Sequence, residues 1–393
     1  MFENIIGHKQ TVDLLREQVA SGRLPGSILI EGPRYAGKLT LALELARSLT
    51  CTGDRSWNCR CPSCRSQKLL IQSDTLLLGY DNFMEEISVA RQLLEAKDQI
   101  YSRYLFLRSV RKLLRRFDPV FYDEKETKFK KVQPLLAYLE EALGGIEPED
   151  LSTPVKPKVL DGIVENAADL AKELNLSTIP VNQIRKVTFW AHTSTTESRK
   201  VVIIENAEKM NDSSRNSMLK ILEEPPANCF FIFLSSRTGE IIPTIRSRLR
   251  SYPLKERTAE ENGKVLSLIF RENSGAYSSI SSYFDSFDPD VEVLSGLASQ
   301  FLEYYLSDTR SQDAKNQLKE QLKDIKGDSV KVFLEKLLEQ ARSALPGAAF
   351  STAGRLEKLC RSLNRIWFDF ESLNMNPQLL FEYLLYDEGG LLL

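Results

Sequence analysis

The sequence predicts an α/β module, a parallel sheet with helices on both faces, followed by α-helical domains. Three continuous apolar runs of strand length, Ser27–Ile30, Val201–Ile204 and Cys229–Leu234, alternate with helical segments. Such runs are typical of parallel strands that are buried on both faces. From Glu256 onward no segment predicts a strand, and the apolar periodicity is helical.

Length and composition indicate an ordinary soluble protein. The 393 residues suffice for two or three domains. The formal charge of −2 gives no overall attraction to nucleic acid, so a polyanion would need a local basic patch. The sequence contains no apolar run of about 18 residues and no basic-then-apolar layout at its N-terminus. We therefore expect a cytoplasmic protein.

The first elements form a helix, a strand and a glycine-containing loop. Apolar residues recur at helical spacing over Thr11–Val19, and the strand Ser27–Ile30 follows after a Pro-Gly step. The next residues read EGPRYAGKLT, in which Gly32, Gly37 and Lys38 fit the pattern G-x-x-x-x-G-K. The backbone N–H groups of such a loop and the N-terminus of the helix after it favour an anionic phosphate. The sequence therefore predicts a phosphate-binding loop.

This loop lacks the hydroxyl that normally ligates magnesium. Leu39 follows Lys38 where Ser or Thr is expected. Thr40 is no simple substitute, because one helical step turns a side chain by roughly 100°. Two interpretations stay open: a loop that binds nucleotide, and a glycine turn between strand and helix that binds no ligand.

The end of the second apolar run also lacks a group that ATP hydrolysis needs. In ATPases with such a loop, an acidic pair at this point serves magnesium and the attacking water. Glu205 can still contact a metal, but the amide of Asn206 cannot accept a proton as a general base. ATP binding stays open, and hydrolysis by this chain is not expected. The degenerate nucleotide site comprises Gly32, Gly37, Lys38, Thr40 and Glu205.

A cluster of cysteines follows the helix after the loop. The stretch CTGDRSWNCRCPSC contains Cys51, Cys59, Cys61 and Cys64. Four thiolates satisfy tetrahedral zinc in a closed structural site, and the Cys61–Cys64 spacing is that of a usual zinc knuckle. The gap from Cys59 to Cys61 is shorter than usual, and a loop of reduced cysteines is the alternative. The two other cysteines, Cys229 and Cys360, lie in apolar surroundings and are expected in cores.

Residues 84–172 differ from their flanks, with helical periodicity and dense charge, and we interpret them as an insertion. Within it, the segment Tyr101–Phe117 is an apolar helix pattern rich in basic residues. Such a helix can bind phosphate or an acidic partner, but more often it is a solvated face whose apolar side packs on its own hairpin. The basic residues are Arg103, Arg108, Arg111, Lys112, Arg115 and Arg116.

Further motifs connect the chain to a known family. Four stretches carry the resemblance: LKILEEPPANCFFIFLSS, IPTIRSRL, STIPVNQIRKV from Ser177 to Val187, and NMNPQLLFEYLL from Asn374 to Leu385. They resemble bacterial DNA polymerase III clamp-loader subunits of the AAA+ class, in particular the delta-prime type. The resemblance covers about residues 1–80 and 175–255 well and the C-terminus more loosely. It implies an AAA+ domain over 1–255 with the knuckle at 51–64 and the insertion at 84–172, a helical lid over 256–300 and a helical collar over 301–393.

The resemblance implies a role for one arginine. In this family the arginine of a Ser-Arg-Cys motif reaches ATP held by a neighbouring subunit, and the matching residue is Arg248, with Leu249 in place of the cysteine. Arg246 is a nearby rival, and the alternative is that Arg248 only pairs with an acidic surface residue. Delta-prime subunits resemble ATPases whose own site has decayed while this arginine is kept, which agrees with Leu39 and Asn206.

The implied function is that of a non-hydrolysing structural subunit of the clamp loader. Its expected partners are gamma/tau-type ATPase subunits and the delta subunit, and through the complex the sliding clamp and primed DNA. Two alternatives stay open: a gamma/tau-type ATPase with an atypical metal arrangement, and a zinc-stabilised DNA-binding protein. The near-neutral charge disfavours the latter.

Overall fold

Within the described residues, five parallel strands form one sheet in the order β2-β3-β4-β1-β5. The strands are β1 (Ser27–Glu31), β2 (Thr75–Leu78), β3 (Lys200–Ile204), β4 (Cys229–Ser235) and β5 (Arg250–Pro253). The computed structural model describes residues 1–79, 83–123, 126–174, 178–193, 199–273, 275–277, 279–307, 309–345, 348–373 and 376–386. Three quoted residues, Ser177, Asn374 and Met375, lie outside these ranges.

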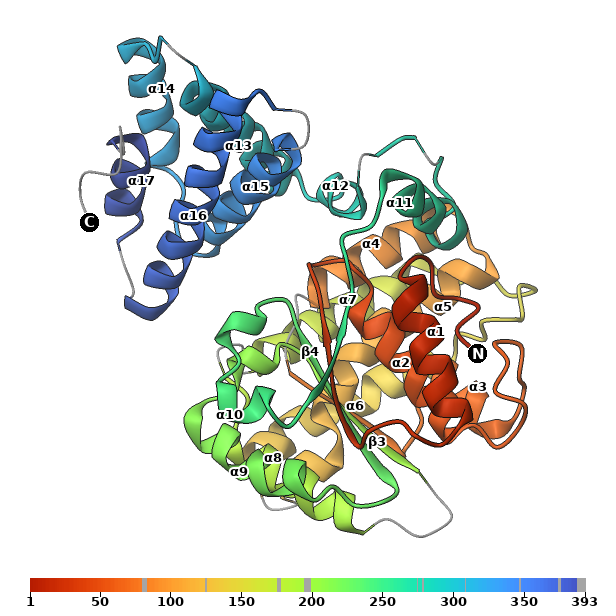
Figure 1. The fold of residues 1–393 in the computed structure, drawn as a ribbon. Coiled ribbons are helices and arrows are strands. Elements are labelled where there is room, and N and C mark those ends of the chain that lie inside the picture. The colour runs from red at the N-terminus through yellow and green to blue at the C-terminus, as the bar shows by residue number, and fades with distance from the viewer. Residues whose placement is uncertain are drawn as a thin grey trace. The chain divides into compact units, whose positions relative to one another are not determined.

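Helices cover both faces of the sheet (Figure 1). On β1, Ile28 and Ile30 face one core with α1 (Lys9–Ala20) and α2 (Lys38–Thr50). The intervening Leu29 faces the other core, with α8 (Val181–His192) and α9 (Asp212–Glu223). Successive side chains of a strand point to opposite faces, so a strand buried on both sides must be apolar throughout. The expected α/β module and its three long apolar strands are confirmed, and the parallel sheet fits the AAA+ fold.

Sequence reasoning missed the two edge strands. In β2 all four residues are buried, but its run of three leucines is too short to distinguish from a buried helical turn. In β5 only Tyr252 is buried, and Arg250 and Pro253 are exposed. Proline lacks a backbone N–H and is tolerated at the edge of a sheet, where that donor has no partner strand.

The expected helical character of residues 84–172 is confirmed. Buried side chains such as Phe106, Leu113, Leu139 and Ile163 make a core separate from those of the sheet. The helices are α4 (Phe83–Ala96), α5 (Ile100–Leu114), α6 (Thr127–Gly144) and α7 (Pro157–Lys172), with single 3₁₀ turns η1 (Arg115–Phe117) and η2 (Pro119–Phe121) after α5.

The basic segment is not a solvated face, although its apolar side packs on the neighbouring helix α4 as expected. None of its six basic side chains is exposed, and most donate to main-chain carbonyls of the same unit. Arg108 and Arg111 donate to the carbonyl oxygens of Lys68 and Leu69 at the end of α3 (Pro62–Lys68), at 2.5 and 3.2 Å. The last carbonyls of a helix lack internal partners, and a guanidinium offers five N–H donors. These charged groups bind main-chain carbonyl oxygens inside the protein, and they form neither a solvated face nor a polyanion site.

The chain divides into two units, Met1–Ser282 and Tyr283–Leu393. The second unit is helical, as the apolar periodicity after Glu256 predicts. The expected boundary at residue 300 falls inside α13, so the division into lid and collar stays a prediction. The helices of this unit are α13 (Pro289–Leu306), α14 (Gln312–Leu322), α15 (Asp328–Ala344), α16 (Phe350–Leu373) and α17 (Pro377–Tyr386). Among the described residues, no helix is long and apolar enough to cross a membrane.

Arg103 shows how much the insertion depends on such a buried cation. Its side chain is 2% exposed, pairs with Asp98 and donates to the carbonyl oxygens of Glu147 and Thr153 at 2.9 and 2.7 Å. We expect Arg103→Ala to destabilise the first unit by about 3 kcal/mol, because it removes the counter-charge of Asp98 and the donor to both carbonyl oxygens. Chemical denaturation measures the loss. Lys131→Ala, which removes a 69% exposed partner of Glu173, is the control and should cost less than about 1 kcal/mol. Equal losses for the two variants would contradict the prediction.

Candidate functional site

The glycine loop lies where the sequence places it, between β1 and α2. Gly37 precedes α2 with φ of 89°, a conformation that favours glycine. A Cβ on Gly32 would lie 2.5 Å from the carbonyl oxygen of Leu254, so a side chain does not fit there. Both glycines of the pattern are therefore required by the backbone, and the strand–loop–helix context of a phosphate-binding loop is present.

Two cations lie against this loop and bind its own carbonyl oxygens. Lys38 Nζ donates to the oxygens of Gly32 at 2.8 Å and Pro33 at 2.6 Å. The guanidinium of Arg257 donates to the carbonyl oxygen of Tyr35. A Cβ on Gly37 would lie 2.5 Å from Nη2 of this guanidinium. The sequence analysis did not single out Arg257, because it follows the loop by more than 200 residues. The loop is thus stabilised by positive charge from within the chain.

The two residues after Lys38 have different environments. Leu39 packs against the core between α2 and the sheet, and Thr40 is exposed. The position that carries the magnesium-binding hydroxyl in the usual pattern is therefore used for packing, and the next hydroxyl along the chain, that of Thr40, is exposed.

Glu205 follows β3 directly and is 7% exposed. Its carboxylate forms an ion pair with the buried guanidinium of Arg116, from the 3₁₀ turn after α5. Arg116 also donates to the carbonyl oxygen of Leu78 at the end of β2, at 2.9 Å. Asn206 has a positive φ of 48°, which asparagine tolerates better than most residues. The partner of Glu205 was missed, since 89 positions separate it from Arg116.

Helix α4 contacts the other half of the site. Glu85 accepts hydrogen bonds from Arg34 Nη2 and from the hydroxyl of Tyr35, each at 2.9 Å. Both of these residues belong to the glycine loop. The insertion therefore contacts the loop through Glu85 and the end of β3 through Arg116.

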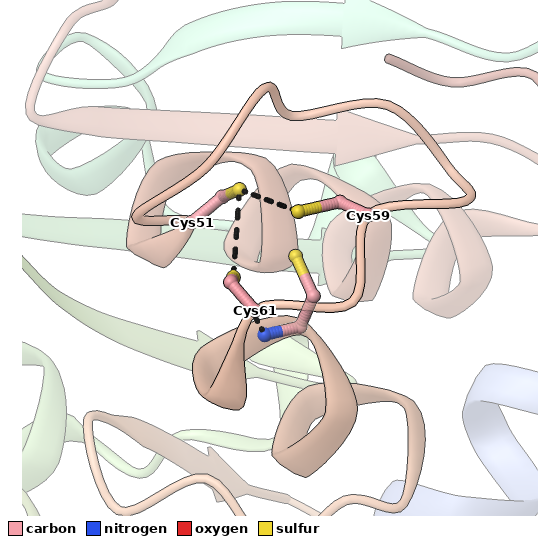
Figure 2. Close-up of side chains that lie close together, drawn as sticks. Cys51, Cys59 and Cys61 are labelled. Atoms are coloured by element: carbon pink, nitrogen blue, oxygen red, sulfur yellow. Dashed lines mark hydrogen bonds between the residues drawn. The ribbon is translucent and has the colours of Figure 1, made fainter.

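The four clustered cysteines converge, and Figure 2 shows Cys51, Cys59 and Cys61 of this cluster. All four sulfur atoms lie within 4.8 Å of one another, and Cys51 Sγ is 3.7 Å from that of Cys59 and 3.9 Å from that of Cys61. A zinc–sulfur distance of about 2.3 Å gives a tetrahedral edge of about 3.8 Å. Cys51 follows the last residue of α2, and Cys61 is the N-cap of α3. The short spacing from Cys59 to Cys61 therefore does not prevent convergence.

Burial raises the pKa of the Cys64 thiol, whereas charged and polar groups around the cluster favour thiolates. Arg47 Nη1 donates to Cys64 Sγ at 3.1 Å, and Arg47 is itself paired with buried Glu44. Burial opposes ionisation of Cys61, but hydrogen bonds from Thr52 and from the N–H of Cys64 lower the pKa of Cys61 to about 5. Four sulfur donors at these separations, with an outer shell that orients them, are compatible with a structural zinc site.

Arg248 lies between α10 (Pro243–Arg246) and β5. Its side chain is 31% exposed and pairs with Glu223, Nε to Oε1 at 3.1 Å, while Nη1 donates to the carbonyl oxygen of Thr244 at 2.7 Å. Leu249 packs against the core under α8 and α9, and Arg246 is exposed. The pairing of Arg248 with an acidic surface residue is thus present.

Comparison with known proteins gives the family. The model of the family described as "DNA polymerase III, delta subunit" matches residues 7–103 and 150–258, just over half of the chain. The chain belongs to this family. The match omits residues 104–149, which contain most of α5 and all of α6, so the insertion expected at 84–172 lies partly inside the matched regions.

Individual relatives agree with the family. The chain is 41% identical over 71 residues to DNA polymerase III subunit delta' of Pseudomonas aeruginosa, which is 18% of this chain and 22% of that protein. It is 40% identical over 72 residues to subunit delta' of Buchnera aphidicola, 18% of this chain and 21% of that one. Against subunit gamma/tau of Mycobacterium bovis it is 29% identical over 121 residues, 27% and 20% of the two chains. The matches thus span about a fifth of each relative, and the resemblance to delta-prime subunits is confirmed.

His8 should make the stability of the loop region depend on pH. Burial lowers the pKa of His8 and nearby Arg257 lowers it further, although a 2.8 Å hydrogen bond to the carbonyl oxygen of Ala36 and the charge of Glu261 act in the opposite direction. Below pH about 6.5 the unfolded chain therefore binds more protons than the folded one, so stability falls as the pH drops. We expect His8→Asn to flatten this fall between pH about 7 and 5, measured by denaturation. Asparagine tolerates the positive φ of 55°.

The control is His192→Asn, at the other of the two histidines, which is exposed. It should keep the pH profile of the unsubstituted chain. A profile for His8→Asn that matches the unsubstituted chain would show that His8 does not cause the dependence.

Proposed function

We propose that this chain is the delta-prime-type subunit of a DNA polymerase III clamp loader, a structural subunit that does not hydrolyse ATP. In this role it assembles with gamma/tau-type ATPase subunits and the delta subunit, and supplies Arg248 to ATP bound by a neighbour during loading of the sliding clamp on primed DNA. The observation that carries the proposal is an asymmetry: the chain's own site has Leu39, Asn206 and an already paired Glu205, while Arg248 lies at the surface.

The contacts of Arg248 would allow its guanidinium to leave Glu223 and bind a phosphate of a neighbouring subunit. Its partner Glu223 is 53% exposed, and a solvent-exposed ion pair contributes only about 0–1 kcal/mol. The free-energy cost of exchanging that carboxylate for a phosphate of a neighbouring subunit is therefore small. The hydrogen bond to Thr244 and the packing of Leu249 keep the arginine at the end of α10.

The gamma/tau alternative needs the chain to hydrolyse ATP by itself, and the paired carboxylate of Glu205 opposes it. The DNA-binding alternative is weakened further, because the one dense basic segment in the sequence lies inside the first unit. ATP turnover by the isolated chain would decide for the gamma/tau alternative. DNA binding by the isolated chain that resists salt would decide for the DNA-binding alternative.

The test is reconstitution with the partner ATPase subunits. We expect the isolated chain to show no ATP turnover and Arg248→Ala to lower turnover at the site it completes by on the order of 10³-fold or more, as for other arginine fingers. Steady-state ATP hydrolysis and clamp loading by the reconstituted complex measure this, and Arg250→Ala, on the adjacent strand, is the control. Unchanged turnover would remove Arg248 from the role, and a loss with Arg246→Ala alone would assign it to Arg246.

We further propose that the cysteine cluster holds one structural zinc ion. The sulfur separations and the contacts of Arg47 support this. We expect zinc to copurify at about one ion per chain, and Cys64→Ser to lose it and to lower the melting temperature, because metal binding contributes to folding. Elemental analysis and thermal unfolding measure the two effects. Cys360→Ser, outside the cluster, should keep the metal, and absence of zinc from the unsubstituted protein would contradict the proposal.

A further inference from the structure

The cation paired with Glu205 comes from a part of the chain outside the family match. Arg116 belongs to the turn η1 that follows α5, within residues 104–149. Glu205 belongs to the matched region and occupies the position where ATPases of this kind keep a metal-binding acidic group. The degenerate site therefore contains an added residue as well as the two altered ones.

The added guanidinium lies between two strand ends. Its side chain is 2% exposed, and it contacts Glu205 after β3 and the carbonyl oxygen of Leu78 on β2. The guanidinium carbon lies 5.3 Å from the centroid of the Phe83 ring, at the start of α4. A Cβ on Gly79 would lie 2.1 Å from the carbonyl oxygen of Glu205, so the chain after β2 runs close against this position. The pair is therefore enclosed by backbone and by an aromatic ring.

Neighbouring arginines fix the element that carries Arg116. Arg108 and Arg111 bind the carbonyls at the end of α3, and Arg115 binds that of Gln72 at 3.0 Å. These positions recur at three- and four-residue spacing, so they share one face of the helix. The face contacts the chain from the end of α3 to Gln72, before β2. Arg116 is thus held in place by several independent contacts.

The same pair of helices also holds the glycine loop. α4 and α5 share a core in which Ile87 and Leu94 of one helix and Leu107 and Val110 of the other are buried. Glu85 of α4 binds Arg34 and Tyr35 of the loop. The two halves of the nucleotide site, which in an ATPase are bridged by nucleotide and metal, are here connected through protein side chains.

We propose that Arg116 is a built-in cation that takes the place of a divalent metal at Glu205. The α4–α5 pair, and not magnesium or nucleotide, then sets the arrangement of the glycine loop and the end of β3. A metal ion at this carboxylate would compete with the guanidinium for Oε2, and to displace the guanidinium would leave a buried cation without its counter-charge. The inference rests on the proposed non-hydrolysing role of this site, and it does not involve Arg248.

The test is a double-mutant cycle on the pair, with MgCl2 as the probe. We compare the melting temperatures of the unsubstituted chain, Arg116→Met, Glu205→Gln and the double variant, each with and without millimolar MgCl2. The unsubstituted chain should not respond to magnesium. Arg116→Met should lose several degrees, regain part of them with magnesium, and show faster hydrogen exchange in the glycine loop and β3. The double variant should lose less than the sum of the single variants and should not respond to magnesium.

Lys112→Met is the matched control, because it removes a nearby cation, on α5, that pairs with Glu86 and not with Glu205. It should show no magnesium response. If Arg116→Met does not fold, Arg116→Lys keeps a cation at the position and should retain the insensitivity to magnesium, whereas Glu205→Gln tests the carboxylate from the other side.

Two results would overturn the inference: a magnesium-dependent gain in the unsubstituted chain that Glu205→Gln abolishes, or additive losses in the cycle. Either would leave the proposed role of Arg248 untouched. ATP turnover by the isolated chain would instead overturn the proposed function, so the two failures are distinguishable.

Discussion

The first unit depends on the requirement that a charge or carbonyl removed from water must find a partner inside the protein. Its arginines meet this requirement in pairs with the ends of other elements: Arg108 and Arg111 with α3, and Arg116 with β2 and Glu205. Removal of one member leaves the other unpaired, which is far more unfavourable than the net contribution of the pair. The sheet, the cysteine cluster and the helices of the insertion are therefore coupled through a few buried guanidinium groups.

Burial separates the roles of two arginines that look alike in the sequence. Arg116 is 2% exposed and contacts a carboxylate that is nearly as buried, so it is committed to the interior. Arg248 is 31% exposed, and its partner Glu223 is more exposed still. A guanidinium that must act on another subunit has to exchange its resident partner for a phosphate, and only the second arginine can do this without an unpaired buried charge.

Local signals in the sequence were sufficient for some features and not for others. The apolar runs gave β1, β3 and β4, and the cysteines within one short stretch gave the cluster, because each depends on neighbouring residues. The edge strands were missed since β2 is short and only one residue of β5 is buried. The partner of Glu205 and the contact of Arg257 with the glycine loop depend on distant residues brought together by packing. A run of basic residues carries no signal of whether it faces solvent or carbonyl groups inside the protein.

The distribution of these contacts bears on how a nucleotide site can lose its activity. Leu39 and Asn206 are losses: each replaces a group that chemistry needs. Arg116 is a gain, because it supplies a positive charge to the buried carboxylate of Glu205 in place of a metal ion. An acidic residue that no longer binds a metal is destabilising in the interior unless it is replaced or paired, and here it is paired. The segment outside the family match therefore has a physical reason to contact the matched core at Glu205, and Arg116 makes that contact.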